Sequence, residues 1–158
     1  MSPAPAPTAF DLAERPGFLI RRLHQIHVAL FAEECAKFDV TPVQYSILSA
    51  VQARPGLEQA RLGEEVGVDR ATLANVVGRL EARGLLRRTA SSTDRRVRLV
   101  EITRAGRSLL IRMEEAARRA HARTIAALPA AERRAFTDAL ARLVEAGNGH
   151  GRAPLRLG

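Results

Sequence analysis

Residues 70–83 carry side chains suited to reading a nucleic acid. Their apolar positions repeat at helical spacing, and small residues such as Gly78 occupy much of the opposite side, so the helix can seat deeply in a groove. Asparagine suits adenine, arginine suits guanine, and threonine contacts a base edge or the thymine methyl group. Thr72, Asn75 and Arg79 are therefore predicted to face the major groove. The alternative is a surface helix that packs against a partner helix.

A dense run of arginines follows. Residues 83–98 hold six arginines and a single acid, Asp94, for a local net charge of +5. Arginines at this density favour phosphate contacts and insertion into a narrow A·T minor groove, where the negative potential is strongest. A face that contacts only water is the alternative, and it is disfavoured because strands on either side of residues 90–96 would place the run at a protruding tip.

Two short helices joined by a tight turn precede these residues. Thr41 and Gln44 have the spacing of a capping box, so a helix is predicted to begin there. The next helix ends at Gly67, and Asp69 caps the helix over residues 70–83. A three-residue turn that contains glycine, between two amphipathic helices, is typical of a helix-turn-helix.

The remaining elements position this motif. Residues 85–89 and 97–102 are predicted to be two strands, which makes the loop between them a wing. Long helices are predicted over residues 11–37 and from Thr103 to about Leu128, and a last helix begins at Pro129. The predicted fold class is mainly α with a small β wing and six helices. Tails are expected at residues 1–10, which alternate proline and alanine, and at residues 148–158.

Composition limits the function. The 158 residues hold 25 basic and 17 acidic side chains, for a net charge of +8, which favours a polyanionic partner. Aromatic residues make up 4%, too few for a sheet that stacks bases. We find no signal peptide, no 18-residue apolar run and no phosphate loop or catalytic pair, and one cysteine fits a reducing compartment. We therefore expect a cytoplasmic protein, away from membranes, that is not an enzyme and needs no cofactor.

The segment DRATLANVVGRLEARGLLRR, followed by SSTDRRVRLVEITRAG, strongly resembles the MarR family of winged-helix transcriptional regulators. The most specific matches are LExxGLLxR at residues 80–88, DxR at residues 94–96 and ITxxG at residues 102–106. The order of elements matches over residues 11–147. The resemblance implies a sequence-specific regulator, most often a repressor, with a winged helix-turn-helix at residues 38–103 and an intertwined helical dimerisation region at residues 11–37 and 104–147.

The resemblance also implies roles for individual residues. Arg70, with the three residues named above, falls on the recognition helix of the family. Asp94 and Arg96 match the pair that braces the wing, and Arg95 matches the residue that enters the minor groove. Family members are homodimers, which implies a pseudo-palindromic site in double-stranded DNA with half-sites roughly 10 bp apart. Gly78 departs from the larger residue common in the family, which leaves the preferred DNA sequence open.

Many family members release DNA when a small aromatic acid or phenol binds between the dimer helices and the winged domain. The candidate effector-binding residues here are Arg21 (or Arg22), His24, His27, Phe31 and Tyr45. An arginine can pair with a ligand carboxylate. The alternative is that His27 and Phe31 are packing residues and that the arginines contact only water.

Other interpretations remain beside this one. His24 and His27 can share a metal, as in zinc-responsive members of the family, with Glu34, Cys35 or His121 as a third ligand, but no metal site is predicted. Cys35 follows two acidic residues, which favours a buried, inert thiol over a peroxide sensor. An architectural protein that binds DNA without a ligand, or a winged module that binds proteins, would also fit the fold.

Overall fold

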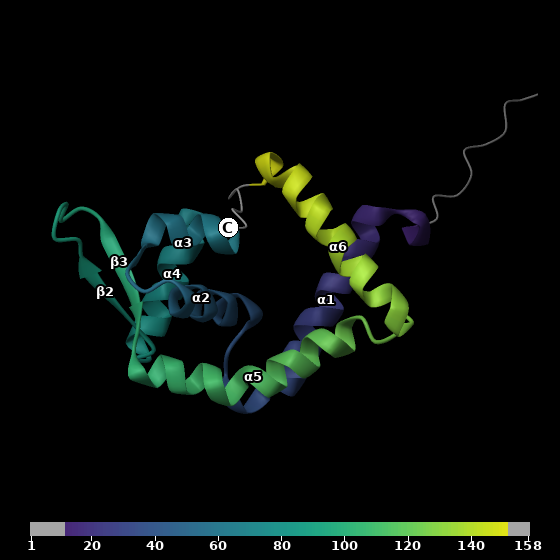
Figure 1. The fold of residues 1–158 in the computed structure, drawn as a ribbon, viewed down its shortest axis with the longest axis horizontal. Helices are drawn as coiled ribbons and strands as arrows, with labels where there is room; N and C mark the ends of the chain where they lie inside the picture. The colour runs from purple at the N-terminus through teal and green to yellow at the C-terminus, as the bar shows by residue number, and fades with distance from the viewer. Residues whose placement is uncertain (1–11, 152–158) are drawn as a thin grey trace, which may run out of the picture.

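The computed structural model describes residues 12–151, within which six α-helices and a three-stranded sheet form the fold (Figure 1). The helices are α1 (Pro16–Glu34), α2 (Pro42–Ala53), α3 (Gln59–Val66), α4 (Arg70–Ala82), α5 (Arg104–Thr124) and α6 (Ala130–Gly147). The strands are β1 (Leu57–Glu58), β2 (Leu86–Ala90) and β3 (Arg98–Ile102), and three short 3-10 helices are η1 (Leu12–Glu14), η2 (Ala36–Phe38) and η3 (Asn148–His150). The predicted fold class is confirmed.

Side-chain caps fix the beginnings of the helices around the turn. Thr41 accepts a hydrogen bond from the backbone N–H of Gln44, whose side chain accepts one in return from the Thr41 N–H. Asp69 Oδ1 accepts from the N–H groups of Ala71 and Thr72 at 3.1 and 3.0 Å. Gly67 takes the left-handed conformation, with φ of 65°, that ends α3 and turns the chain into α4. The predicted helix-turn-helix is therefore present.

The wing differs from the prediction in detail. Both main strands begin one residue later than predicted, and β2 pairs with β3 in antiparallel register from Leu86 opposite Ile102 to Ala90 opposite Arg98. A third strand, β1, pairs with the other edge of β3 and gives the order β1-β3-β2. This two-residue strand was not predicted because it is too short to show an alternating pattern.

The predicted bounds of two long helices are wrong. The first helix begins at Pro16 rather than residue 11, and it ends at Glu34 rather than residue 37, where η2 and a left-handed Asp39 (φ 51°) turn the chain. α5 ends at Thr124, four residues before the predicted end. The predicted C-terminal tail begins with η3, and residues 1–11 and 152–158 lie outside the described part of the chain.

We call α2, α3, α4 and the three-stranded sheet the winged lobe. The core lies in this lobe and continues along α5. Ile47, Leu62, Leu73 and Leu80 bring α2, α3 and α4 together and are at most 1% exposed. Val100 adds β3 to the same cluster, and four residues of α5 from Met113 to Ala120, together with Phe31 of α1, extend it away from the sheet. No helix within residues 12–151 is long and apolar enough to span a membrane.

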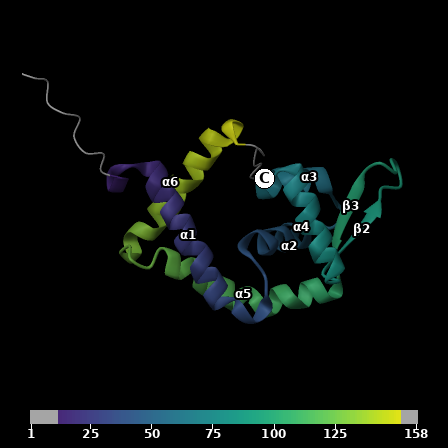
Figure 2. The ribbon, with the colours of Figure 1, turned by 180° about the vertical axis from the view of Figure 1, so that it is seen from behind.

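The helices at the far end of the molecule cover little of each other. In both views α1 and α6 lie at the end opposite the wing (Figure 1 and Figure 2). α6 has no buried residue, and Leu143 and Val144 on it are 64% and 45% exposed. On α1, Leu19, Ile20 and Ile26 are about half exposed. Within residues 12–151 this apolar surface is left uncovered, and exposed apolar patches on helices are typical of protein–protein contacts.

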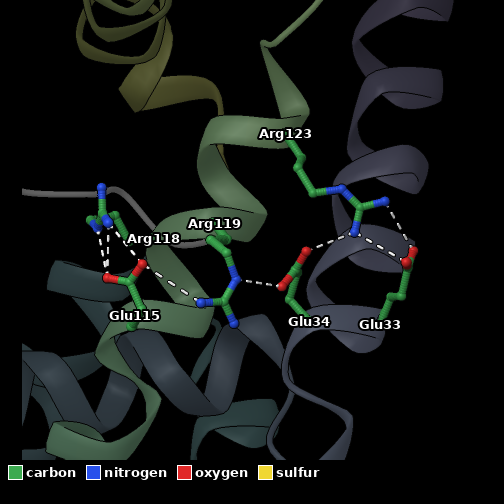
Figure 3. A network of polar contacts seen from close by, with 6 residues as sticks. All are labelled: Glu33, Glu34, Glu115, Arg118, Arg119 and Arg123. Carbon is green, nitrogen blue, oxygen red and sulfur yellow. Dashed lines mark hydrogen bonds and ion pairs between the residues drawn. The ribbon is translucent and has the colours of Figure 1, made fainter.

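An ion network joins the end of α1 to α5 (Figure 3). Arg119 Nε donates to one oxygen of Glu34 and Arg123 Nη1 to the other, both at 2.8 Å, and Arg123 also reaches Glu33. Glu115 pairs with Arg118 and Arg119 along α5. These contacts connect α1, which lies at the end opposite the wing, to α5, which follows β3 of the wing.

Glu34→Gln is expected to lower the melting temperature at neutral pH. It should also make the melting temperature decrease less as the pH is lowered. The hydrogen bonds from Arg119 and Arg123 hold the pKa of the Glu34 carboxyl below its ordinary value of 4.5. A depressed folded-state pKa means that the charged carboxylate stabilises the fold above pH 4.5 and that this contribution is lost as the pH falls through the folded-state pKa. Thermal unfolding followed from neutral pH to about pH 3 measures the effect.

Glu115→Gln is the matched control, because its side chain is 61% exposed against 16% for Glu34. It should lower the melting temperature less. Parallel pH profiles for wild type and Glu34→Gln would exclude the network as a source of acid sensitivity.

Candidate nucleic-acid interface and effector cluster

The outer side of α4 presents the predicted base-reading residues. Arg70, Thr72, Asn75 and Arg79 are all exposed. The Thr72 hydroxyl donates to Asp69 Oδ2 at 2.7 Å, so its proton is used in the helix cap and its methyl group and oxygen lone pairs are what it can offer a base. The hydrogen bonds of Thr72 lower the pKa of Asp69, which keeps the cap ionised. Gly78 has open space around it, with the Arg88 guanidinium 3.9 Å from where a Cβ would lie.

Four of the six arginines in residues 83–98 have partners within the protein: Arg83, Arg87, Arg88 and, at the wing tip, Arg96. Arg88 Nε and Nη2 donate to Glu81 Oε2 of α4 at 2.8 and 2.6 Å, and the Arg88 backbone N–H donates to Oε1 at 2.9 Å. Arg87 donates to Glu101 on the neighbouring strand at 2.7 Å. Arg83 donates to two backbone carbonyl groups, of Phe38 and Asp39. The Arg88 pair fastens the wing to the recognition helix.

The wing tip has the predicted brace. Asp94 Oδ1 accepts from the backbone N–H of Arg96 at 2.9 Å, and its two oxygens accept from the Arg96 guanidinium at 3.2 Å. The Arg96 side chain is 91% exposed, so the ion pair is well solvated, and the backbone bonds are what shape the loop. Arg95 beside them is exposed and forms no ion pair with any residue in the range 12–151. Its guanidinium is therefore available to a polyanion.

Asp94→Ala is expected to weaken DNA binding while leaving the melting temperature within about 2 °C of wild type. The bonds to Arg96 lower the pKa of Asp94, which identifies the carboxylate as the form that shapes the tip, yet the tip lies outside the core. Fluorescence anisotropy and thermal unfolding give the two readouts. Asp94→Asn, which keeps one acceptor oxygen, should bind better than Asp94→Ala. A large drop in melting temperature would instead make Asp94 a residue of the folding core.

Aromatic side chains from three helices meet where α1 crosses α5. His27 and His121 stack with ring centroids 4.9 Å apart, Phe31 lies 6.1 Å from His27, and Tyr45 of α2 lies 5.7 Å from Phe31. We call these four residues the aromatic cluster. His121 was not among the predicted effector residues, because nothing in the sequence relates it to a residue 94 positions earlier.

Hydrogen bonds define the state of His27 in this cluster. The Thr124 hydroxyl donates its single proton to the carbonyl of Ala120, so it accepts from His27 Nδ1 at 2.9 Å. Burial, with the nearby His121 and His24, lowers the pKa of His27 and favours the neutral ring. A neutral ring that carries its proton on Nδ1 leaves Nε2 as a hydrogen-bond acceptor.

A surface hollow of about 530 Å³ opens next to the cluster, between α2 and α5. Tyr45 and Ser49 line one side, and Leu110, Ile111 and Glu114 line the other. Tyr45 donates to Glu114 across it at 3.3 Å, and Ile111 is 74% exposed. Its lining is mixed, with three apolar residues and four polar ones that include Gln52.

Two predicted effector residues lie apart from the aromatic contacts. The Arg21 guanidinium carbon lies 5.3 Å from the ring centroid of Phe18, nearer the start of α1. His24 is exposed and makes no ring contact within the described residues. In one chain, the structure therefore unites His27, Phe31 and Tyr45, and leaves Arg21 and His24 on the surface of α1.

The sensing alternatives gain no support from the geometry. No group of three histidine, cysteine or acidic residues in the range 12–151 is arranged to hold a metal ion. Cys35 is 1% exposed, and burial together with Glu34 raises the pKa of its thiol. The predicted burial of Cys35 is confirmed, and its inertness stays a prediction.

A helix-turn-helix with a basic wing and an exposed polar recognition helix defines a winged-helix DNA-binding protein. A family model described as the MarR family matches residues 38–97. The HTH-type transcriptional repressor NicR of Pseudomonas putida is 33% identical over 147 residues, which cover 91% of this chain and 93% of NicR. This chain belongs to the MarR family of transcriptional regulators.

Two solved structures show the same architecture over most of the chain. The PcaV regulator from Streptomyces coelicolor, in complex with its natural ligand, is 38% identical with a TM-score of 0.80, covering 89% of this chain and 99% of PcaV. BpsR from Bordetella bronchiseptica, whose DNA binding is regulated by 6-hydroxynicotinic acid, is 31% identical with a TM-score of 0.80, covering 85% of this chain and 96% of BpsR.

Proposed function

We propose that this protein is a cytoplasmic homodimeric repressor that binds a pseudo-palindromic operator and is released by a small aromatic acid. The observation that carries the proposal is the place of the aromatic cluster, at the joint between the winged lobe and the long helices. A ligand bound there contacts α1, α2 and α5 together, so it can change how the lobe is held. The regulation of BpsR by 6-hydroxynicotinic acid supports the same ligand class.

The proposed division of the chain follows the two kinds of surface. Residues 38–103 carry the exposed polar side of α4 and the wing, and they bind DNA. Residues 11–37 and 104–147 carry the uncovered apolar surface of α1 and α6, and they form the dimer. A two-fold dimer places two recognition helices in successive major grooves, roughly 34 Å apart.

The chemistry of the cluster suits a hydroxylated aromatic acid. The neutral His27 ring offers Nε2 as an acceptor for a phenol hydroxyl, while the half-buried Tyr45 ring offers aromatic surface backed by the buried Phe31. Arg21 and His24, exposed on α1, supply positive charge or hydrogen bonds to the carboxylate in the dimer. The protein acts by binding and carries out no catalysis.

The test is operator binding by fluorescence anisotropy. The operator is selected from random duplexes, titrated at two salt concentrations, and challenged with a panel of aromatic acids, zinc and peroxide. We expect a palindromic site and release by an aromatic acid. Sequence-independent binding that nothing releases would establish an architectural protein instead, and release by zinc or peroxide alone would transfer the sensing role to the histidines or Cys35.

His27→Ala is expected to raise the acid concentration needed for half release by about tenfold, the equivalent of one lost hydrogen bond, with operator affinity unchanged. His150→Ala removes an exposed imidazole from η3 and is the matched control. The release curve of each variant is measured with the same operator. Equal release curves for wild type and His27→Ala would leave His27 as a packing residue.

A further inference from the structure

A second hollow, of about 410 Å³, lies on a different part of the lobe. It forms where η2, the C-terminal end of α4 and the N-terminal half of α5 meet. Its apolar lining is Phe38, Leu85 and Leu109, each at most 8% exposed, and its basic lining is Lys37, Arg83 and Arg112. No carboxylate lines it. We call this site the basic hollow.

The three cations of the basic hollow are held by neutral partners. Arg83 donates to the carbonyl oxygens of Asp39 and Phe38 at 2.6 and 3.2 Å, and the Lys37 ammonium lies 5.0 Å from the centroid of the Phe38 ring. Arg112 donates to a backbone carbonyl one turn earlier in α5. Within residues 12–151 none of the three forms an ion pair, and the carboxylate of Asp39 forms none either. The positive charges are thus oriented without being neutralised.

This arrangement contrasts with the later arginines of α5. Arg118, Arg119 and Arg123, on the C-terminal half of the helix, all pair with glutamates, whereas Arg107 on the N-terminal half, like Arg112, donates to a backbone carbonyl. Three like charges gathered around an apolar floor repel one another, and an anion that binds among them removes that repulsion. A phosphate group has the charge and the three acceptor oxygens to bond all three side chains at once.

We propose that the basic hollow binds a small organic phosphate monoester, with the phosphate among Lys37, Arg83 and Arg112 and the organic group against Phe38 and the two leucines. A phosphate of the DNA backbone shares this chemistry. The hollow, however, lies at the Arg83 end of α4, about 18 Å along the helix from Arg70, and beside the root of the wing rather than its tip. A free ligand therefore fits the location better than the operator does.

A ligand in the basic hollow would connect three elements that otherwise meet only at their edges. Lys37 lies in the turn before α2, Arg83 follows the recognition helix and Arg112 belongs to α5. Binding would stabilise the folded lobe by mass action, and it would hold the end of α4 against α5. The inference concerns a second ligand and does not depend on the aromatic acid proposed above.

Isothermal titration with phenyl phosphate, in a chloride buffer free of phosphate, tests the proposal on the full chain. We expect one site per chain, and at least about a tenfold weaker affinity in the Lys37→Gln/Arg112→Gln variant. Arg61→Gln/Arg142→Gln makes the same change in charge on α3 and α6 and should keep the wild-type affinity. Benzyl alcohol, which lacks the phosphate, should not bind. Arg112→Gln alone replaces the double variant if the double variant loses its thermal transition.

Several outcomes would overturn the proposal. No heat at concentrations on the order of 10 mM, or an equal loss in both double variants, would mean that no site exists beyond general charge. A loss in His27→Ala but not in Lys37→Gln/Arg112→Gln would move the ligand to the aromatic cluster. A fall in operator affinity of Lys37→Gln/Arg112→Gln as large as that of Arg95→Ala would assign the basic hollow to the DNA backbone.

Discussion

Arg95→Ala is expected to weaken operator binding by about 1–3 kcal/mol, roughly 5- to 150-fold, with no change in thermal stability. Arg95 is exposed at the wing tip and has no ion-pair partner among residues 12–151, so removing it costs the free protein little. Its neighbours at the brace hold the loop that presents it. A narrow minor groove concentrates negative potential, which makes an inserted guanidinium worth more there than on an open surface.

Anisotropy titrations at several salt concentrations measure this effect. The dependence of the logarithm of affinity on the logarithm of salt concentration should become shallower by about one for Arg95→Ala, because one fewer phosphate-associated cation is released. Arg142→Ala, which removes an exposed arginine from α6, is the charge-matched control. Unchanged affinity in Arg95→Ala would remove the proposed minor-groove contact.

Gly106→Ala is expected to be the most destabilising single methyl group that can be added to the described glycines. A Cβ at this position would overlap the carbonyl oxygen of Leu85 and lie 2.7 Å from Cγ1 of Ile102. The backbone cannot move away easily, because Thr103 hydrogen-bonds to the carbonyls of Gly84 and Leu85 while its hydroxyl caps α5 at the Gly106 N–H. Overpacking against backbone of this kind costs about 3 kcal/mol.

Thermal unfolding should show the cost as a fall in melting temperature of roughly 6–12 °C for a chain of this size. Gly17→Ala is the control, since a Cβ at Gly17 of α1 has nothing within 4 Å. There the added methyl group should slightly raise stability, because alanine is the better helix former. A melting temperature of Gly106→Ala equal to that of Gly17→Ala would mean that α5 shifts freely at the root of the wing.

Local signals in the sequence were enough for the helices and the two longer strands of the winged lobe. The sequence predicts that a helix begins after each of Thr41, Asp69 and Thr103, and each of these residues is an N-cap in the structure. The ends of α1 and α5 were placed too far out because apolar residues continue past the last helical turn. In the structure α1 ends at Glu34 and gives way to η2 and a left-handed Asp39, and the apolar pattern does not signal this change of backbone.

Pairings between distant residues were beyond prediction. Six arginines near the wing looked equivalent, yet Arg87 lies opposite Glu101 and Arg88 reaches back to Glu81. Strand register and the angle of the wing determine which arginine has a partner. Neither can be predicted from the local amino-acid composition. His121 joined the aromatic cluster for the same reason, through the crossing of α1 and α5.

Because α5 is one uninterrupted helix, a small rotation at one end displaces the other end by several ångströms. Its 21 residues make a rod about 31 Å long, which meets α1 through the ion network at one end and supports the wing at the other. If the rod pivots about its far end by about 5°, the root of the wing moves by about 3 Å. In the proposed two-fold pair the two displacements would add, so a tilt of about 5° would change the distance between the two winged lobes by about 6 Å. Both lobes must match the fixed helical repeat of DNA.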